Sequence, residues 1–137
     1  MTNAQRVKQF MNMGGQQVDL PANEPMPFDV LCLRHRLETE EHMEMIEALH
    51  NYAESEGTSA KDRAHLAKEL ADKLVISYGT LIAMGLDPDK VFNIVQDEND
   101  AKIATGTKRD DGKIIVSPEV KAQLKQETYK KLLMLVS

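Results

Sequence analysis

The sequence predicts an all-α protein built as a helical bundle. Two long segments, 28–53 and 59–84, carry apolar residues at helical spacing and contain no proline. The chain has no Trp and few Phe and Tyr, so Leu, Ile, Val, Ala and eight Met must fill its interior. This composition favours helices over a β-sandwich. With 137 residues, we expect one domain with a buried core.

Charge and cysteine usage narrow the possible functions. A formal net charge of −5 argues against a general nucleic-acid binder, which would carry a basic surface. The single cysteine, Cys32, excludes an internal disulfide framework, and its apolar neighbours predict that it is buried. The sequence shows neither a signal-like N-terminus nor an apolar run of membrane-spanning length. We therefore expect a soluble, cytoplasmic protein.

The N-terminal part of the chain predicts three helices. Residues 2–13 form a short helix, and the prolines that follow keep the chain extended as an arm up to residue 27. The second helix covers 28–53. After a turn, Ser59 and Asp62 resemble a capping box at the start of the third helix. Gly85 is well placed to end that helix.

The C-terminal part predicts two more helices. Asp87 is a candidate N-cap with Pro88 at the first helical position, opening a short helix that ends near Asn99. Residues 104–116 carry turn residues and predict a loop or a small hairpin. A proline then opens the last helix, which covers 119–136.

Carboxylates interrupt the apolar face of the second helix. At 100° per residue, Glu41 and Glu44 fall inside the apolar stripe, with Glu40 at its edge. Glu38 and Glu47 lie off the stripe centre and are not expected to take part. The rest of the stripe is Val30, Leu33, Leu37 and Ala48. Because unpaired buried carboxylates are costly, the acids in the stripe need a cation or a proton.

The third helix carries a second pair of acids, Glu69 and Asp72, one turn apart and nearly opposite its main apolar stripe. The stripe consists of Ala67, Leu70, Ala71, Leu74, Val75, Tyr78, Leu81 and Ile82. The later half of the acid side is apolar as well, so only a strip with Lys73, Ser77 and Thr80 is expected to face solvent. A helix that is apolar on two sides is buried on two sides, which predicts a homodimer.

Two antiparallel helices joined by a short turn would bring these acids together. Glu41 converges with Glu44, and Glu69 with Asp72, because residues three apart share a helix face. Hard cations such as Mg²⁺ are held by carboxylate oxygens and polarise phosphoryl groups or activate water. Acid runs are also commonly solvated helix faces, and periodicity leaves both interpretations open.

Asn99 and Lys102 form a second polar set on one helical face. An amide and a cation near a metal site would suit phosphate oxygens. Taken alone, the same two residues are better explained as an ordinary polar surface.

A di-iron carboxylate bundle is an alternative use of paired acids, because such bundles carry Glu-x-x-His motifs on facing helices. Glu47 with His50 fits one such motif, and Asp62 with His65 imitates another. Both histidines are expected at the loop ends of their helices, away from the acids. Four helices that each contribute an inward ligand cannot be found, which disfavours this alternative.

The ordered set of motifs resembles the all-α nucleoside triphosphate pyrophosphohydrolases, the MazG-like and phosphoribosyl-ATP pyrophosphohydrolase-like group. The resemblance covers roughly Phe28 to Pro118. It consists of Leu33-Arg34 through Leu37, Glu40-Glu41-x-x-Glu44, Glu69-x-x-Asp72, Tyr78-Gly79-Thr80, Gly85-Leu86, Asn99-x-x-Lys102 and Asp111-Gly112-Lys113. It implies a core at 28–118 within a single domain spanning 1–137, flanked by an N-terminal helix and arm at 1–27 and a C-terminal helix at 119–137.

The resemblance implies a MazG-like bundle that forms a homodimer or a dimer of dimers. It also implies hydrolysis of a nucleoside triphosphate, with a dNTP expected, to the monophosphate and pyrophosphate with Mg²⁺ or Mn²⁺. Carried over by position, Glu41, Glu44, Glu69 and Asp72 are the metal ligands, and Glu40 orients or deprotonates water or is a further ligand. Asn99 and Lys102 contact the substrate, from the same subunit or its neighbour.

Departures from the family pattern affect packing and substrate. Lys73 stands where relatives usually have an apolar residue, and Ala101 replaces a frequent Ser. The Lys-Val-Gly-Glu-Glu run typical of the histidine-pathway enzyme is missing, which makes phosphoribosyl-ATP a less expected substrate than a nucleotide. A helical module that binds a nucleotide or a partner without catalysis is the alternative to an enzyme.

Overall fold

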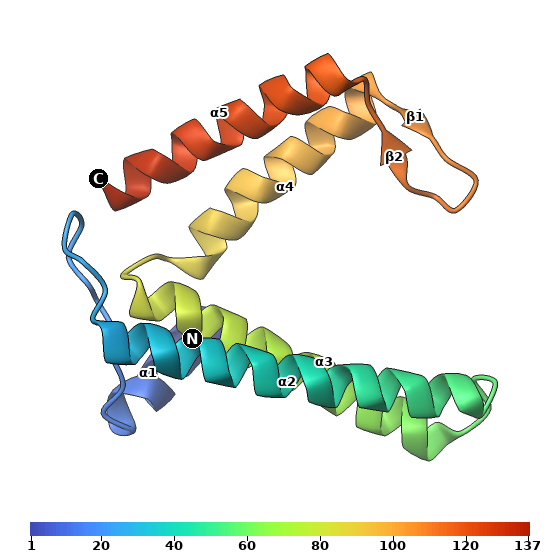
Figure 1. The fold of residues 1–137 in the computed structure, drawn as a ribbon, viewed down its shortest axis with the longest axis horizontal. Helices are drawn as coiled ribbons and strands as arrows, with labels where there is room; N and C mark the ends of the chain where they lie inside the picture. The colour runs from blue at the N-terminus through green and yellow to red at the C-terminus, as the bar shows by residue number, and fades with distance from the viewer. The chain divides into compact units, whose positions relative to one another are not determined.

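The computed structural model describes all residues from 1 to 137 and confirms the all-α fold class. Five helices are joined by an extended arm at residues 14–27, two short turns and one two-stranded hairpin (Figure 1). The elements are α1 (Asn3–Met13), α2 (Phe28–Glu54), α3 (Ala60–Ala83), α4 (Pro88–Thr105), β1 (Thr107–Lys108), β2 (Ile114–Ile115) and α5 (Pro118–Val136).

The chain divides into two compact units. Unit 1 consists of Met1–Leu20 and Glu24–Gly85, and unit 2 of Pro21–Asn23 and Leu86–Ser137. Unit 1 therefore contains α1, α2 and α3, whereas unit 2 contains α4, the hairpin and α5. The expected single domain spanning 1–137 stays a prediction.

Side-chain caps start most of the helices. Thr2 and Gln5 form a reciprocal capping box at α1, and Ser59 accepts a hydrogen bond from the backbone N–H of Asp62 at α3. The N-cap at Asp87 and the proline after it start α4 as predicted. Because α2 and α3 are joined only by the turn at residues 55–59, they run back along each other for most of their length (Figure 1).

The core of unit 1 lies where α1 meets the end of α3. Val7 and Met11 of α1 pack with Ile82 and Ala83 of α3. Around them lie Val18, Met26, Val30 and Tyr78, which are half-buried. Gly85 lets the arm pass close to the end of α3, because an added Cβ there would collide with the carbonyl of Leu20. Its φ of 77° also suits glycine.

The structure corrects the predicted solvent exposure of part of α3. Ser77 and Thr80, which were expected to face solvent, instead hydrogen-bond to Glu38 of α2. In the main apolar stripe, Leu70 and Leu74 remain 45% and 60% exposed. The acid side of α3 faces α2 as expected, because Glu69 and Asp72 lie beside Glu41. The error concerns Ser77 and Thr80, which lie next to that side and find polar partners on α2.

Unit 2 is built on the contact between α4 and α5. The expected hairpin is present: Thr107 pairs with Ile115 and Lys108 with Ile114 in antiparallel register. The prediction that the fourth helix ends near Asn99 is wrong, since α4 continues to Thr105. The last helix agrees with prediction to within one residue.

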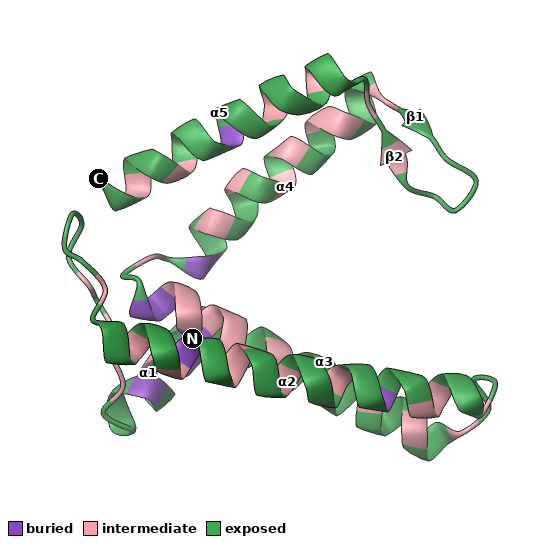
Figure 2. Cartoon of the chain, viewed as in Figure 1, coloured by how far each residue is buried: buried purple, intermediate pink, exposed green.

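Few residues are fully buried, and most large apolar side chains keep some exposure (Figure 2). The prediction of a buried cysteine is wrong, because Cys32 is exposed on α2. Its apolar neighbours include Phe28 and Leu31, which are themselves 80% and 49% exposed, so the apolar run does not mark a core. No helix in the structure has both the length and the apolar character needed to cross a membrane.

Candidate functional site

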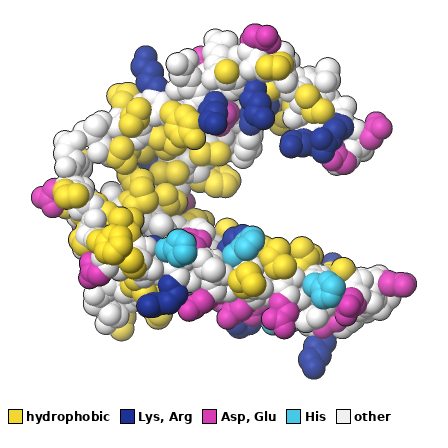
Figure 3. All heavy atoms as spheres, in the orientation of Figure 1, with side chains coloured by type: hydrophobic (Ala, Val, Ile, Leu, Met, Phe, Trp, Pro, Cys, Tyr) yellow, Lys and Arg dark blue, Asp and Glu magenta, His cyan; other side chains and the backbone are white.

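Three of the predicted acids meet between α2 and α3. Glu41 of α2 and Glu69 and Asp72 of α3 each offer a carboxylate oxygen within 4.8 Å of the others. We call these three residues the carboxylate cluster. Glu69 is buried, and Glu41 and Asp72 are half-buried. Acidic side chains also gather along the α2–α3 pair on the face shown in Figure 3.

Two carboxylate oxygens of the cluster have no hydrogen-bond partner. Glu41 Oε2 and Glu69 Oε2 are buried from solvent, and no donor in the chain reaches them. A buried acceptor without a donor is costly, and native proteins leave few of them. Carboxylate oxygens gathered in this way suit a hard dication as ligands, and a bound dication would satisfy both unpaired oxygens at once. Glu41, Glu69 and Asp72 therefore fit a bound metal ion.

The electrostatics of Glu41 reflect the same crowding. Desolvation by burial raises the pKa of Glu41, and the charges of Glu44, Asp72 and Glu69 raise it further. The ammonium of Lys68 acts in the opposite direction. The carboxylate form of Glu41 is thus disfavoured unless positive charge is supplied to the cluster.

Lys68 and His65 supply positive charge or hydrogen-bond donors from α3 itself. Lys68 Nζ lies 2.8 Å from Asp72 Oδ2 and 3.5 Å from Glu69 Oε1. His65 Nε2 lies 3.3 Å from the same Glu69 oxygen. The prediction that His65 lies away from the acids is wrong, because one helical turn brings it to Glu69. The spacing of four residues in the sequence could have predicted both the contact of His65 with Glu69 and the contact of Lys68 with Asp72.

His50 does not join the carboxylate cluster. Its Nε2 lies 3.1 Å from Glu54 Oε1, one turn later on α2, and both side chains are exposed. The two histidines of the di-iron alternative therefore bind different acids, and only His65 reaches the cluster.

The remaining predicted site residues are not part of the cluster. Glu44 is exposed, although its charge acts on Glu41. Glu40 is exposed on α2 next to Glu41. Asn99 and Lys102 belong to α4 in unit 2, where Asn99 donates to Gln96 and Lys102 lies 4.0 Å from Glu98.

A buried arginine lies on α2 before the acids. Arg34 is 4% exposed and donates to Thr80 Oγ1 at 3.1 Å, to Gln16 Oε1 at 3.1 Å and to the Ile76 carbonyl at 2.7 Å. Burial lowers the pKa of Arg34, and the nearby charge of Glu38 opposes that effect. We call this set, with the Glu38 contacts to Ser77 and Thr80, the guanidinium network.

Gly79 makes the guanidinium network possible. A Cβ added at this position would lie 2.5 Å from Arg34 Nη2 and 3.3 Å from Met11 Sδ. Only glycine leaves room for the guanidinium against α3. The motif residues Arg34 and Gly79-Thr80, 45 positions apart, thus meet in one structural feature. Sequence reasoning missed their contact because Thr80 was expected to face solvent and Arg34 was assigned no contact.

Lys73 departs from the family pattern without entering the core. Its Nζ lies 2.9 Å from His42 Nδ1, and this contact crosses from α3 to α2 beside the carboxylate cluster. The two side chains directly follow Asp72 and Glu41 in sequence. A polar contact therefore replaces the apolar packing expected from relatives.

Comparison with known proteins assigns the family. A comparison with curated proteins found no match. The family model described as phosphoribosyl-ATP pyrophosphohydrolase matches residues 12–99, more than half of the chain. The matched range includes the whole carboxylate cluster and the guanidinium network, and it ends before the hairpin and α5. The chain belongs to the phosphoribosyl-ATP pyrophosphohydrolase family, within the MazG-like all-α nucleoside triphosphate pyrophosphohydrolase superfamily.

Proposed function

We propose that the protein hydrolyses a nucleoside triphosphate, preferably a dNTP, to the monophosphate and pyrophosphate in a Mg²⁺-dependent reaction. The observation that supports this proposal most directly is the carboxylate cluster. Its three residues each offer a carboxylate oxygen within 4.8 Å of the others, and one oxygen each of Glu41 and Glu69 is buried without a donor. Family membership supplies the reaction class, pyrophosphate release from a nucleotide-like substrate.

Glu41, Glu69 and Asp72 would hold the ion, with Glu44 as the fourth ligand. A bound Mg²⁺, or Mn²⁺ in its place, would neutralise charge on the phosphates and lower the pKa of water. Water attacks the α-phosphorus, the bond from that phosphorus to the pyrophosphate oxygen breaks, and Glu40 accepts the proton. Glu40 suits this role because it is exposed beside Glu41 and has no ion-pair partner. Asn99 and Lys102 contact the substrate.

Phosphoribosyl-ATP is a second candidate substrate, and the family match favours it. Its hydrolysis breaks the same kind of phosphoanhydride bond and needs the same acids. The sequence lacks the Lys-Val-Gly-Glu-Glu run of the histidine-pathway enzyme, which favours the nucleotide proposal. Substrate preference must therefore be measured with both kinds of molecule.

The test is pyrophosphate release from a panel of ribo- and deoxynucleoside triphosphates and phosphoribosyl-ATP, each with Mg²⁺ and with chelator. We expect turnover of at least one substrate only with Mg²⁺. Glu41→Gln and Asp72→Asn should reduce kcat roughly 10²–10³-fold, as when one charge-stabilising group is removed from a site. Glu47→Gln is the matched control, because Glu47 is exposed on the same helix and outside the cluster.

The outcomes separate the alternatives. Unchanged turnover in both Glu41→Gln and Asp72→Asn would exclude the proposed ligands. Mg²⁺-dependent nucleotide binding without any product would support the non-catalytic binding module instead. Turnover confined to phosphoribosyl-ATP would replace the dNTP as substrate and leave the roles of the acids in place.

We also propose that the protein forms a homodimer or a dimer of dimers. Exposed apolar side chains support this proposal: Met43 of α2 is 64% exposed, and Leu74 and Val75 of α3 are 60% and 41% exposed. Covering such surfaces is a main driving force of association. Sedimentation velocity at micromolar concentration should show a dimer or a tetramer, and a monomer would contradict the proposal.

A further inference from the structure

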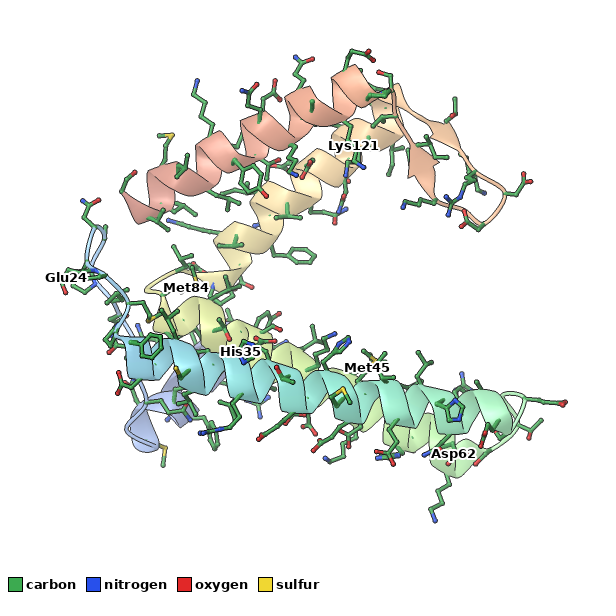
Figure 4. The ribbon with its side chains drawn as sticks, in the orientation of Figure 1. Glu24, His35, Met45, Asp62, Met84 and Lys121 are labelled. Carbon is green, nitrogen blue, oxygen red and sulfur yellow. The ribbon has the colours of Figure 1, made fainter.

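A basic groove lies between α4 and α5 in unit 2. It is lined by Val95, Glu98 and Lys102 of α4 and by Lys121, Lys125, Thr128, Tyr129 and Leu132 of α5. Its volume of about 350 Å³ falls within the range of roughly 300–1,000 Å³ that is usual for small-molecule sites. We call it the lysine groove. Lys121 lies on the side of α5 that faces α4 (Figure 4).

We propose that the lysine groove binds a nucleotide, with Lys121 and Lys125 at the phosphates and Tyr129 stacked on the base. The class of ligand rests on the proposed function, whereas the site rests on the groove itself. Lys121, Lys125 and Tyr129 lie on α5, beyond the residues that the family model matches.

Helix geometry aligns the groups that would contact the ligand. Lys121, Lys125 and Tyr129 follow at intervals of four residues and therefore share one face of α5. Each interval corresponds to a rise of about 6 Å along the helix. Two ammonium groups and an aromatic ring thus form a row, the order in which a nucleotide presents its phosphates and its base.

The charge of the groove is opposite to that of the whole chain. Three lysines and one glutamate line it, whereas the chain has a formal net charge of −5. Glu98 lies 4.0 Å from Lys102, but Lys121 and Lys125 take part in no ion pair. Cations gathered without acidic partners attract an anion with several negative oxygens.

Tyr129 offers the surface for a base. The residue is 55% exposed, and Lys125 Nζ lies 5.7 Å from the centroid of its ring. Bases stack on exposed aromatic rings in many nucleotide-binding and single-strand-binding sites. A phosphate that draws the Lys125 ammonium away from the ring leaves its face open to the base.

The remaining lining residues form the floor. Val95 and Leu132 are apolar, and the Thr128 hydroxyl already donates to the Leu124 carbonyl at 3.0 Å. Thr128 is buried and so does not compete for the ligand. Recognition therefore depends on the lysines and the tyrosine.

The test is isothermal titration of the full-length protein with a dNTP analogue that has a methylene bridge between its α- and β-phosphorus atoms. Excess EDTA excludes binding through a metal ion. We expect saturable binding to the wild type. The double change Lys121→Gln with Lys125→Gln should weaken binding at least about tenfold, because bonds to two charged donors are lost. Tyr129→Leu should weaken it by a smaller factor.

Lys131→Gln is the matched control, because Lys131 lies on the same helix but does not line the groove. It should bind like the wild type, and circular dichroism should show that every variant is folded. Unchanged affinity in the double variant, or no binding by the wild type in EDTA, would overturn the proposal. So would tighter binding of a short single-stranded DNA than of the analogue.

The binding test of the lysine groove can be interpreted whether or not the protein hydrolyses a nucleotide. Binding in EDTA that depends on Lys121 and Lys125 supports the groove even when no substrate is hydrolysed. Binding that requires Mg²⁺ and disappears in Glu69→Gln assigns the nucleotide to the carboxylate cluster alone and overturns the groove.

Discussion

The guanidinium network and the carboxylate cluster lie in the same interface between α2 and α3, yet they differ in how their charges are satisfied. Arg34 is buried and donates to three separate acceptors. Glu41 and Glu69 each keep one buried oxygen without a donor. Since proteins leave few buried polar groups unpaired, the paired charge indicates a structural role, whereas the unpaired carboxylate oxygens fit the metal site that we propose.

The difference follows from the residues that face each group. Opposite Arg34, α3 presents a glycine, a threonine hydroxyl and a backbone carbonyl, which leave space and acceptors for a guanidinium. Opposite Glu41, α3 presents two more carboxylates. The interface between α2 and α3 therefore holds an arginine whose hydrogen bonds are satisfied and, further along, a group of carboxylates whose hydrogen bonds are not.

The largest expected effect tests whether the guanidinium network stabilises the fold. Arg34→Met keeps an apolar stem but removes the donors to Gln16, Thr80 and Ile76. The free energy of unfolding should fall by about 3 kcal/mol or more, because three half-buried acceptors lose their partner and the buried arginine is gone. Urea denaturation measures this change.

Arg36→Met is the control for Arg34→Met, since Arg36 is exposed on the same helix and the change should stay within about 0.5 kcal/mol. A loss below about 1 kcal/mol for Arg34→Met would mean that the network does not stabilise the interface. Thr80→Val, with an expected loss of about 1 kcal/mol, gives a milder probe if Arg34→Met does not fold.

An effect of intermediate size tests whether the carboxylate cluster binds a metal ion. Mg²⁺ at about 100 times its Kd should add about 2.7 kcal/mol to the stability of the folded wild type. The rise in Tm between chelator and Mg²⁺ should disappear in Glu69→Gln and persist in Glu47→Gln. A rise of equal size in Glu69→Gln would place the ion elsewhere. Differential scanning calorimetry provides the measurement.

The smallest effect concerns pH. Because the pKa of Glu41 is raised, the folded state binds more protons than the unfolded state above the ordinary glutamate value of about 4.3. In chelator, stability should therefore fall as pH rises from that value through the raised pKa. Glu41→Gln should remove this loss and raise the Tm by a few degrees at neutral pH.

At pH values below the ordinary glutamate pKa, the advantage of Glu41→Gln should vanish, because the wild-type side chain is then protonated in both states. In Mg²⁺ at neutral pH the order should reverse, since the wild type alone gains the full metal stabilisation. A Tm difference that does not vary with pH would show that the charge of Glu41 is not its cause.

The sequence was sufficient to find the acids but not their neighbours. Glu41 was identified because a carboxylate inside an apolar stripe breaks the helical pattern, and the structure places it beside Glu69 and Asp72. Glu44 met the same criterion and is exposed, because a wheel places a residue on a face and does not say how far the partner helix covers it. The metal itself stays a prediction.

Arg34 and the α3 hydroxyls show the limit of a binary apolar–polar pattern. Ser77 and Thr80 contribute to the α2–α3 contact because Arg34 and Glu38 lie opposite them, and periodicity on one helix carries no information about the other. The prediction that Cys32 is buried is wrong for a related reason. Its apolar neighbours on α2 are exposed, so a local apolar run did not mark the interior.

Lys68 gives the carboxylate cluster a counterion of its own. Its ammonium rests on Asp72 and Glu69, so the folded chain does not have to wait for an outside ion to offset its acids. A dication bound to Asp72 and Glu69, as we propose, would compete with this side chain for the same oxygens. The apparent affinity of the cluster for an ion would then include the free energy of moving the Lys68 ammonium back into solvent.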